Sequence, residues 1–341
     1  MNEFLQFSKY RRRLVFQQAD QEMGLQAASV EKDFWVCWTL RELFAMPGIG
    51  EHLTFKGGTS LSKAWKLIKR FSEDIDLIVD KEIVGFGGAA APDKAVSKNQ
   101  RRARLEDLMD ACREWVQGTL RPALADRLKA ALGEIDWLLE IDPDVPDGQC
   151  LLFHFPSVFP RGTTGSVRPV VKIEVGARSD DWPNAERLIQ PYVAELFPSL
   201  NLSAAFNVRV ISAERTFWEK ACLLHEESFR PADKLRKRGM ARHYYDLWCL
   251  LKADVGRRAM ADMPLFHRVA EHREIFFRLS WVDYTMHKPG TFRLVPPGDQ
   301  IGKWRDDYKQ MLGSMFFGDT PSFDELLAVL REFEQTFNET T

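Results

Sequence analysis

The pattern of apolar residues predicts one buried helix near the start of the chain. Over residues 29–46, apolar side chains occupy nearly all sides of the expected helix, and Pro47 and Gly48 then end it. A helix that is apolar on most sides must be covered by protein on most sides. We therefore expect this helix to pack against a sheet.

Short runs of β-branched and aromatic residues predict strands. These runs cover residues 52–56, 75–80, 151–156, 169–175 and 206–211. Between the first two runs, Leu61, Trp65 and Ile68 recur at helical spacing, so we expect a helix over residues 60–70. The early part of the chain therefore reads as strand, glycine turn, helix and strand.

Two further patterns complete the expected organisation. Residues 85–92 are rich in glycine and alanine, and we expect them to form a mobile loop able to cover a site. Helical patterns occupy residues 103–132 and dominate from residue 212 onward. The chain of 341 residues is thus predicted to be an α+β protein with a mixed sheet in residues 1–211 and an all-helical lobe in residues 212–341.

The composition is that of a soluble protein. Hydrophobic residues make up 45% and charged residues 28% of the chain, and no apolar run approaches the roughly 20 residues that cross a bilayer. Residues 1–13 are polar and basic without a following apolar segment, so we expect no secretory signal, no membrane partner and a cytoplasmic location. The five cysteines form no CxxC pair, which argues against a disulfide scaffold or a cysteine zinc site.

Charge restricts where nucleic acid could bind. The formal net charge is only -2, so any such contact must come from a local patch. Residues 94–104 carry five basic side chains and residues 230–242 carry six. Each run is either a solvated face or a binding surface, and the sequence alone leaves both interpretations open.

A glycine turn marks the end of the first predicted strand. After Lys56 the chain continues Gly57, Gly58, Thr59 and Ser60, where a hydroxyl residue is suited to begin a helix. Glycines let the backbone approach a ligand closely, and the free N–H groups of a helix start attract anions. The turn therefore predicts a phosphate cradle, although similar turns occur in unrelated proteins. It is not a P-loop, because GxxxxGK[ST] is absent.

Paired carboxylates follow this turn. Asp74 and Asp76 are two residues apart in a predicted strand, so both project from one face. Such a pair is unfavourable unless a cation holds it, and hard oxygen ligands suit Mg²⁺ or Mn²⁺. Glu174, which shares a strand face with Lys172, is the candidate third ligand. For all three carboxylates, a solvent-facing strand is the structural alternative.

These residues resemble a known family. The segments GGTSLSK, at residues 57–63, and RFSEDIDLIV, at residues 70–79, look like the nucleotidyltransferase signature of AbiEii-type toxins, within the polymerase-beta-like nucleotidyltransferase superfamily. The resemblance extends along most of the chain. It includes residues 31–33, 214–220, 242–247 and 321–327.

The resemblance implies a set of site residues and a partner. Gly57, Gly58 and either Thr59 or Ser60 would contact nucleotide phosphates, Asp74 and Asp76 would bind metal, and Lys220 and Asp246 would be the later essential pair. The superfamily usually has glycine-serine in its first motif, and here Gly58 is followed by Thr59. The family also implies a polymerase-beta-like core, an RNA acceptor such as the 3' end of a tRNA, and a cognate antitoxin.

The sequence independently singles out Asp246. It interrupts an apolar helical stretch, where a carboxylate must be paired with a cation. Arg242, four residues earlier, is the purely structural candidate for that partner. Lys220 lies at helical spacing among apolar residues, with its stem against the core and its ammonium at an edge. Ser72, beside the aspartates, is expected to be a turn hydroxyl more than a phosphate acceptor.

Together these features predict a metal-dependent enzyme that moves a nucleoside monophosphate from an NTP to RNA. We expect the helical lobe to bring Lys220 and Asp246 to the same cleft as the carboxylates. Two alternatives stay open: a non-catalytic protein that keeps the nucleotide pocket and sequesters a partner, and a transferase with a protein or small-molecule acceptor. If the acceptor is RNA, we expect it to bind across residues 230–242, which lie between the segments that carry Lys220 and Asp246.

Overall fold

A computed structural model describes residues 1–133, 135–160, 162–165, 167–200, 202, 204–312, 315–316 and 320–340. The chain forms two compact units. The first, here called the sheet unit, comprises Met1–Ala64 and Phe71–Val210. The second, here called the helical unit, comprises Trp65–Arg70 and Ile211–Thr341. Among the described residues, no helix combines the length and the apolarity needed to cross a membrane.

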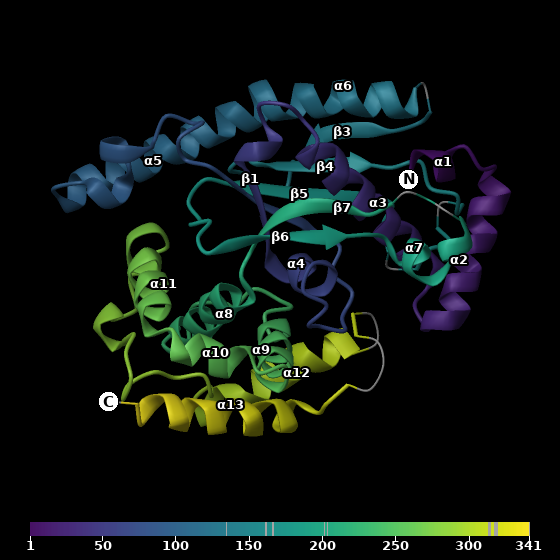
Figure 1. Ribbon diagram of the computed structural model, residues 1–341. Coiled ribbons are helices and arrows are strands. Elements are labelled where there is room, and N and C mark those ends of the chain that lie inside the picture. Colours follow the sequence, from purple (N-terminus) through teal and green to yellow (C-terminus); the bar gives the residue numbers. More distant parts are fainter. Residues whose placement is uncertain are drawn as a thin grey trace. The chain divides into compact units, whose positions relative to one another are not determined.

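A mixed sheet forms the centre of the sheet unit (Figure 1). Within the described residues its strands run in the order β3-β4-β5-β2-β1-β7-β6. They are β1 (Leu53–Lys56), β2 (Ile75–Val79), β3 (Leu138–Ile141), β4 (Cys150–His154), β5 (Val170–Gly176), β6 (Asn184–Ile189) and β7 (Phe206–Ile211). Strand β2 is antiparallel to β1 and parallel to β5, and β1 is parallel to β7. The predicted α+β class and mixed sheet are confirmed.

The two strands that the sequence pattern missed lie at the ends of this order. β3 has the sequence LLEI and β6 has NAERLI, and in β6 four of the six residues are exposed. An edge strand needs few apolar residues because one side and part of its faces meet water. The five strands that were predicted lie between them in the sheet.

The predicted buried helix is α3 (Ala27–Phe44), and it backs the sheet. Trp35 and Trp38 of α3 pack on Phe153 of β4, with ring centroids 5.9 and 6.2 Å apart. The helix is also covered by α2 (Lys9–Met23), α6 (Arg121–Leu132) and α7 (Tyr192–Leu196). Its apolar surface on most sides is thereby buried, as the pattern requires.

The helix expected over residues 60–70 is shorter than predicted. It is α4 (Gly57–Lys63), and the chain leaves the helical conformation after Ala64. Lys66 has a φ of 54°, in the left-handed region that a right-handed helix excludes. The indole of Trp65 donates a hydrogen bond to the carbonyl of Ile211 at 3.1 Å. The helical spacing of Leu61, Trp65 and Ile68 was therefore misleading beyond Lys63.

Residues 85–92 form short turns that contact the helix after them. Two short 3-10 turns, η2 (Gly88–Ala90) and η3 (Pro92–Lys94), occupy the glycine-rich segment. Arg104 of α5 (Lys98–Trp115) donates to the carbonyls of Ala89 and Ala91, each at 2.9 Å. The mobility of this segment stays a prediction. A π-helical turn, η4 (Val116–Leu120), joins α5 to α6 within the predicted 103–132 helix.

Aromatic side chains form the core of the helical unit. Trp218 of α8 (Ala213–Ser228) packs on Phe266 of α11 (Met263–Phe276) and on Phe337 of α13 (Phe323–Asn338), with ring centroids 4.7 and 5.2 Å apart. The remaining helices are α9 (Arg242–Lys252), α10 (Val255–Ala261), η6 (Tyr284–Met286) and α12 (Gly298–Leu312). The described part of the chain after β7 is thus helical, as expected, with one isolated bridge between Arg70 and Phe316.

Candidate functional site

The register of the sheet brings two of the predicted carboxylates next to each other. Asp76 of β2 is paired with Glu174 of the parallel strand β5. Directly paired residues project to the same face, so these two acids are neighbours. Asp74 precedes β2 by one residue and lies two residues from Asp76. The alternation predicted for β5 is confirmed, because Val171, Ile173 and Val175 are buried while Glu174 is exposed.

A lysine is paired with Glu174. The ammonium of Lys172 lies 2.8 Å from the Glu174 carboxylate and 3.6 Å from that of Asp142. Sequence reasoning placed Lys172 on this face without giving it a role. Within the described residues, no three His, Cys, Asp or Glu side chains form a group that could hold a metal ion in this conformation.

The donor chemistry nevertheless suits a hard divalent cation. Burial raises the pKa of Asp74, and the carboxylates of Glu73 and Glu174 raise it further, while Lys32 and Lys172 act in the opposite direction. Carboxylates that share a site in this way are stabilised by a cation. The ligand types present are those that Mg²⁺ or Mn²⁺ prefers, and a metal site at these carboxylates stays a prediction.

The glycine turn lies in close contact with Asp76. Strand β1 ends at Lys56, whose register partner is Asp76, and α4 begins at Gly57 with a φ of 80°. A Cβ atom on Gly57 would lie 2.0 Å from Oδ2 of Asp76, far inside van der Waals contact. Only glycine allows this backbone conformation and this approach together. The turn and the carboxylate predicted from separate motifs are thus in contact.

Both hydroxyls of the turn are buried and used internally. Thr59 donates to the carbonyl of Asp74 at 2.5 Å and accepts from Ser72 at 2.8 Å. Ser60 donates to the carbonyl of Gly57 at 2.9 Å. In this conformation Thr59 fixes the turn to the segment that carries the aspartates, and Ser72 serves as a local hydroxyl. The half-buried backbone of Gly57 is the more accessible part of the turn.

Three consecutive charged residues of α3 are fixed by ion pairs and hydrogen bonds, and two of them contact the segments beside the site. Lys32 lies 2.7 Å from Glu73, and Asp33 lies 2.7 Å from Lys63 at the end of α4. Glu31 accepts hydrogen bonds from Ser157 and from the backbone N–H of Val158. These bonds measure 2.6 and 2.7 Å. In the sequence this trio was visible only through the family resemblance, because charges within a buried helix have no periodic signal.

The helical unit contains a second cluster, centred on Asp246. Its side chain is fully buried. Arg70 donates to both carboxylate oxygens, at 2.6 and 2.8 Å, and the Lys220 ammonium lies 2.8 Å from Oδ2. The expected cation is therefore present twice. The structural candidate Arg242 is not the partner, since its guanidinium donates to the carbonyl of Gly239 at 3.2 Å.

Electrostatics explain how this cluster is charged. Burial acts to raise the pKa of Asp246, but Arg70 and Lys220 outweigh it and hold that pKa far below its usual range. Burial lowers the pKa of Lys220, and Asp246 partly restores it. Burial, with the Lys220 cation next, lowers the pKa of His243 well below its usual value. A neutral His243 can accept from Lys220, whose Nζ is 3.3 Å from Nδ1.

Arg70 and His243 are site residues that sequence reasoning missed. Arg70 lies 176 residues from its partner Asp246, and no local pattern reveals such a pairing. His243 stands three positions before Asp246, where helical spacing offered a weak signal. Glu174, Asp76 and the glycine turn belong to the sheet unit, while Lys220 and Asp246 belong to the helical unit. That all of them serve one cleft stays a prediction.

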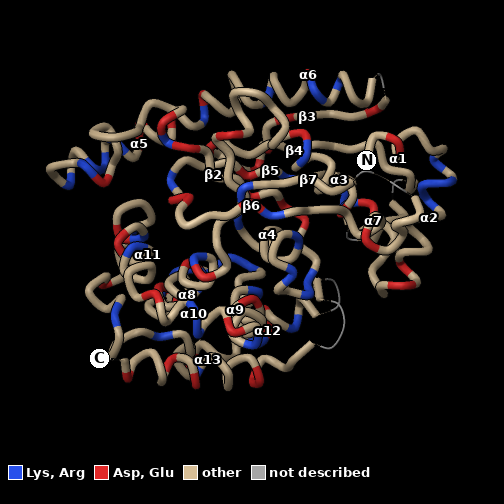
Figure 2. Tube along the Cα trace, viewed as in Figure 1, with Lys and Arg blue, Asp and Glu red and all other residues tan. Residues whose placement is uncertain are grey.

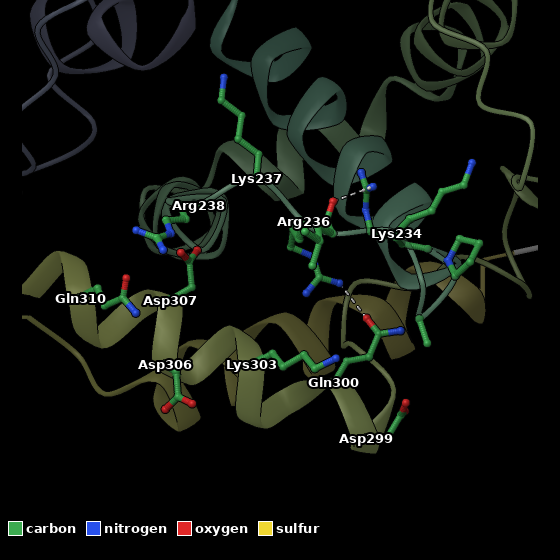
Figure 3. Close-up of a pocket in the computed structure, with 14 residues that line it drawn as sticks. Lys234, Arg236, Lys237, Arg238, Asp299, Gln300, Lys303, Asp306, Asp307 and Gln310 are labelled. Carbon is green, nitrogen blue, oxygen red and sulfur yellow. Dashed lines mark hydrogen bonds between the residues drawn. The ribbon is translucent and has the colours of Figure 1, made fainter.

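The two basic runs differ in their contacts. On α5, Arg102 is paired with Glu106 at 2.9 Å, and Arg104 holds loop carbonyls. Figure 2 shows acidic positions interspersed with the basic ones along this helix. This run has the features of a solvated helix face. In the second run, side chains between residues 230 and 238 line a pocket (Figure 3).

Carboxylates on adjacent strands of a mixed sheet, with a glycine turn against one of them, are the features that the sequence led us to expect of a nucleotidyltransferase. The model of the family described as "Nucleotidyl transferase AbiEii toxin, Type IV TA system" matches residues 38–329. The chain belongs to this family of toxin nucleotidyltransferases.

Two solved structures are similar to the chain. One is MenT4, a nucleotidyltransferase toxin from Mycobacterium tuberculosis, with 17% identity, a TM-score of 0.48 and coverage of 97% of this chain and 90% of that one. The other is JHP933 from Helicobacter pylori, with 14% identity, a TM-score of 0.42 and coverage of 92% and 94%. No curated protein matches the chain.

Proposed function

We propose that this toxin nucleotidyltransferase transfers a nucleoside monophosphate from an NTP to RNA, at the 3' end of a tRNA, in a reaction that requires Mg²⁺ or Mn²⁺. The observation that supports this most is the contact of the Gly57 turn with Asp76, which has Glu174 as its neighbour in the sheet. A phosphate-approaching backbone beside carboxylates is what metal-assisted phosphoryl chemistry needs.

In this proposal, Asp74, Asp76 and Glu174 hold the metal. Mg²⁺ or Mn²⁺ held there would supply positive charge to the triphosphate and would make the attacking hydroxyl easier to deprotonate. The backbone of Gly57 and Gly58 contacts the phosphates, with no side chain to block their approach. The attacking hydroxyl oxygen forms a bond to the α-phosphorus, the bond to pyrophosphate breaks, and the hydroxyl proton leaves to solvent.

Lys220 supplies positive charge in the same proposal. The Lys220 ammonium lies 2.8 Å from Asp246 and 3.3 Å from His243, which hold it in place. Little conformational entropy is therefore lost when it binds a phosphate. As a point charge it neutralises the negative charge that develops on the leaving group. A nucleotide added to the 3' end of a tRNA would block its charging with an amino acid, and growth would stop unless a cognate antitoxin intervened.

Incorporation of labelled nucleotide into RNA tests this proposal. Purified protein is incubated with each labelled NTP, Mg²⁺ and total cellular RNA, and the products are separated by size. We expect the label in tRNA-sized RNA, and none when Mg²⁺ is chelated. Label found in protein or in small molecules would show that the acceptor class is wrong, and no label anywhere would favour a non-catalytic binding protein.

The variant Asp76→Asn provides the mechanistic control, with Asp80→Asn as its match. Asp80 directly follows β2 and has a 40% exposed side chain 3.7 Å from His52. Removal of the Asp76 charge should abolish transfer without unfolding the protein, since like-charged neighbours contribute little stability. The Asp80 variant should transfer normally. Full transfer by Asp76→Asn in excess Mg²⁺ would mean that the carboxylate is structural.

A further inference from the structure

The helical unit has a basic pocket that the proposed chemistry does not use. Its volume is about 480 Å³, and it lies between α12 and the segment 230–238 that follows α8 (Figure 3). Its lining includes three carboxylates and a larger number of cations. The cations are Arg230, Lys234, Arg236, Lys237, Arg238 and Lys303. This concentration of positive charge contrasts with the net charge of -2 for the whole chain.

One arginine anchors the segment to α12. Arg236 donates to Glu227 at 3.1 Å and to Gln300 of α12 at 2.8 Å, the second of which is drawn in Figure 3. Its guanidinium also lies 3.8 Å from the centroid of the Trp304 ring. Arg236 therefore forms part of the pocket wall, and its guanidinium is already occupied by these contacts.

A carboxylate of α12 completes the anchoring. Asp307 accepts hydrogen bonds from the backbone N–H groups of Gly239 and Ala241, at 2.7 and 2.8 Å. Arg230 is paired with Glu227 at 2.6 Å. One of the three lining carboxylates and two of the six cations thus build the pocket, which leaves two carboxylates and four cations at its surface.

Those four cations are available to a ligand. Lys234, Lys237, Arg238 and Lys303 are exposed and form no ion pair within the parts of the chain that the structure describes. The ammonium of Lys234 lies 4.3 Å from the ring centroid of Trp281, a half-buried residue beside the segment. The surface therefore offers four exposed positive charges, one of which lies over the Trp281 ring.

We propose that this pocket binds the phosphate backbone of the RNA acceptor, an inference that rests on the proposed function. Three of the four available cations are lysines, which act as point charges and tolerate many phosphate arrangements. Arg230 and Arg236 are already paired with Glu227, so the groups left to a ligand are mainly lysines.

RNA binding as a function of salt tests the proposal. The full chain is titrated against fluorescein-labelled bulk tRNA at several KCl concentrations, and anisotropy gives the affinity. For the triple variant Lys237→Ala, Arg238→Ala, Lys303→Ala we expect about tenfold or greater loss of affinity at low salt. The slope of log affinity against log salt should fall by about three, one for each lost phosphate contact.

Two controls separate the pocket from total charge. The triple variant Lys252→Ala, Lys288→Ala, Arg331→Ala removes the same charge from exposed positions of the helical unit that do not line the pocket. It should retain the affinity and the slope of the wild type. The charge-preserving variant Lys237→Arg, Arg238→Lys, Lys303→Arg should also bind as the wild type does. Equal melting temperatures verify that all variants are folded.

The proposal is overturned if the pocket variant keeps wild-type affinity and salt slope. It is also overturned if polyglutamate of equal charge displaces labelled tRNA as well as unlabelled tRNA does, because the site would then be one for acidic protein. Transfer assays distinguish the two proposals. Salt-dependent tRNA binding at the pocket without any nucleotide incorporation would contradict only the proposed function. Nucleotide incorporation, with tRNA binding unchanged in the pocket variant, would contradict only the proposed role of the pocket.

Discussion

Gly57 shows how a single residue joins the two motifs of the sheet unit. Its positive φ and its approach to Asp76 are separate requirements, and a Cβ atom would violate both. Gly85 has a similar φ of 85°, but a Cβ there would meet nothing within 4 Å. This difference allows backbone strain to be separated from the clash with the carboxylate.

We predict that Gly57→Ala and Gly85→Ala each lose about 1–3 kcal/mol of unfolding free energy from the strained backbone. Only Gly57→Ala should also lose nucleotide transfer, because Asp76 must move away from the new methyl group. Urea denaturation and the labelled-NTP assay measure the two effects. Transfer by Gly57→Ala at the wild-type rate would show that the contact with Asp76 is unimportant for catalysis.

Asp246 is a fully buried carboxylate of the helical unit that balances two buried cations. Replacement by Asn would leave Arg70 and Lys220 buried without a counter-charge. We predict a loss of about 3–5 kcal/mol in unfolding free energy at neutral pH. The matched variant Asp254→Asn removes an exposed carboxylate paired with Arg257 in the same unit, and it should unfold at the wild-type urea concentration.

The stability contributed by Asp246 should also depend on pH in a defined direction. Its folded pKa lies below the value of about 3.9 for an unfolded aspartate, so the unfolded chain takes up the proton first as the pH falls. The contribution is therefore complete above about pH 5 and shrinks below about pH 4. Wild type and Asp246→Asn should converge in acid. A difference that is independent of pH would argue against the charged pair as its source.

At the scale of elements, the ion pair on β5 would compete with the metal ion that we propose for Glu174. Lys172 is paired with Glu174 and has Asp142 as a second nearby carboxylate, at 3.6 Å. A cation that binds Glu174 must displace the ammonium, and Asp142 can receive it. Partial exposure of Lys172 and Glu174 limits the strength of their pair.

We predict that Lys172→Met binds Mn²⁺ about two- to fivefold more tightly than the wild type, the equivalent of a partly exposed ion pair of about 0.5–1 kcal/mol. Titration followed by the Mn²⁺ spin-resonance signal measures this without an activity assay. Arg209→Met on β7 is the matched control, since Arg209 contacts the carbonyl of Glu51. Unchanged or weaker Mn²⁺ binding by Lys172→Met would show that the lysine does not compete.

Elements with a strong apolar pattern could be predicted from the sequence. Strands at the edges of the sheet, and helix ends without a local signal, could not. The helix α3 and the inner strands followed from residues that must be buried. The edge strands β3 and β6 did not, because water covers much of their surface. The end of α4 was also missed, because Lys66 breaks the helix with a left-handed φ that no proline or glycine signals.

At the scale of the whole molecule, the same limit applies to the candidate site. The glycine turn, the aspartates and Glu174 could be proposed because strand alternation and short spacing relate them. Asp246 could be recognised as needing a cation, but the sequence offered Arg242 where the fold supplies Arg70 and Lys220. A partner that is remote in sequence becomes visible only when the chain is folded.

The short segment Trp65–Arg70 makes the two units inseparable by one cut. It belongs to the helical unit, yet sheet-unit residues precede and follow it in the chain. A fragment that starts at residue 212 lacks Arg70, so Asp246 keeps Lys220 alone. We predict that this fragment is insoluble or unfolded when expressed by itself. A sharp, cooperative melting curve for the isolated fragment would contradict this.

The same segment suggests a fragment complementation experiment. A synthetic peptide covering residues 60–75 should rescue the 212–341 fragment in trans, because it returns the missing arginine, and a peptide with Arg70→Met should not. Helical content measured by circular dichroism would report the rescue. We therefore expect the six residues Trp65–Arg70, between α4 and β2, to determine which fragment of this toxin folds by itself.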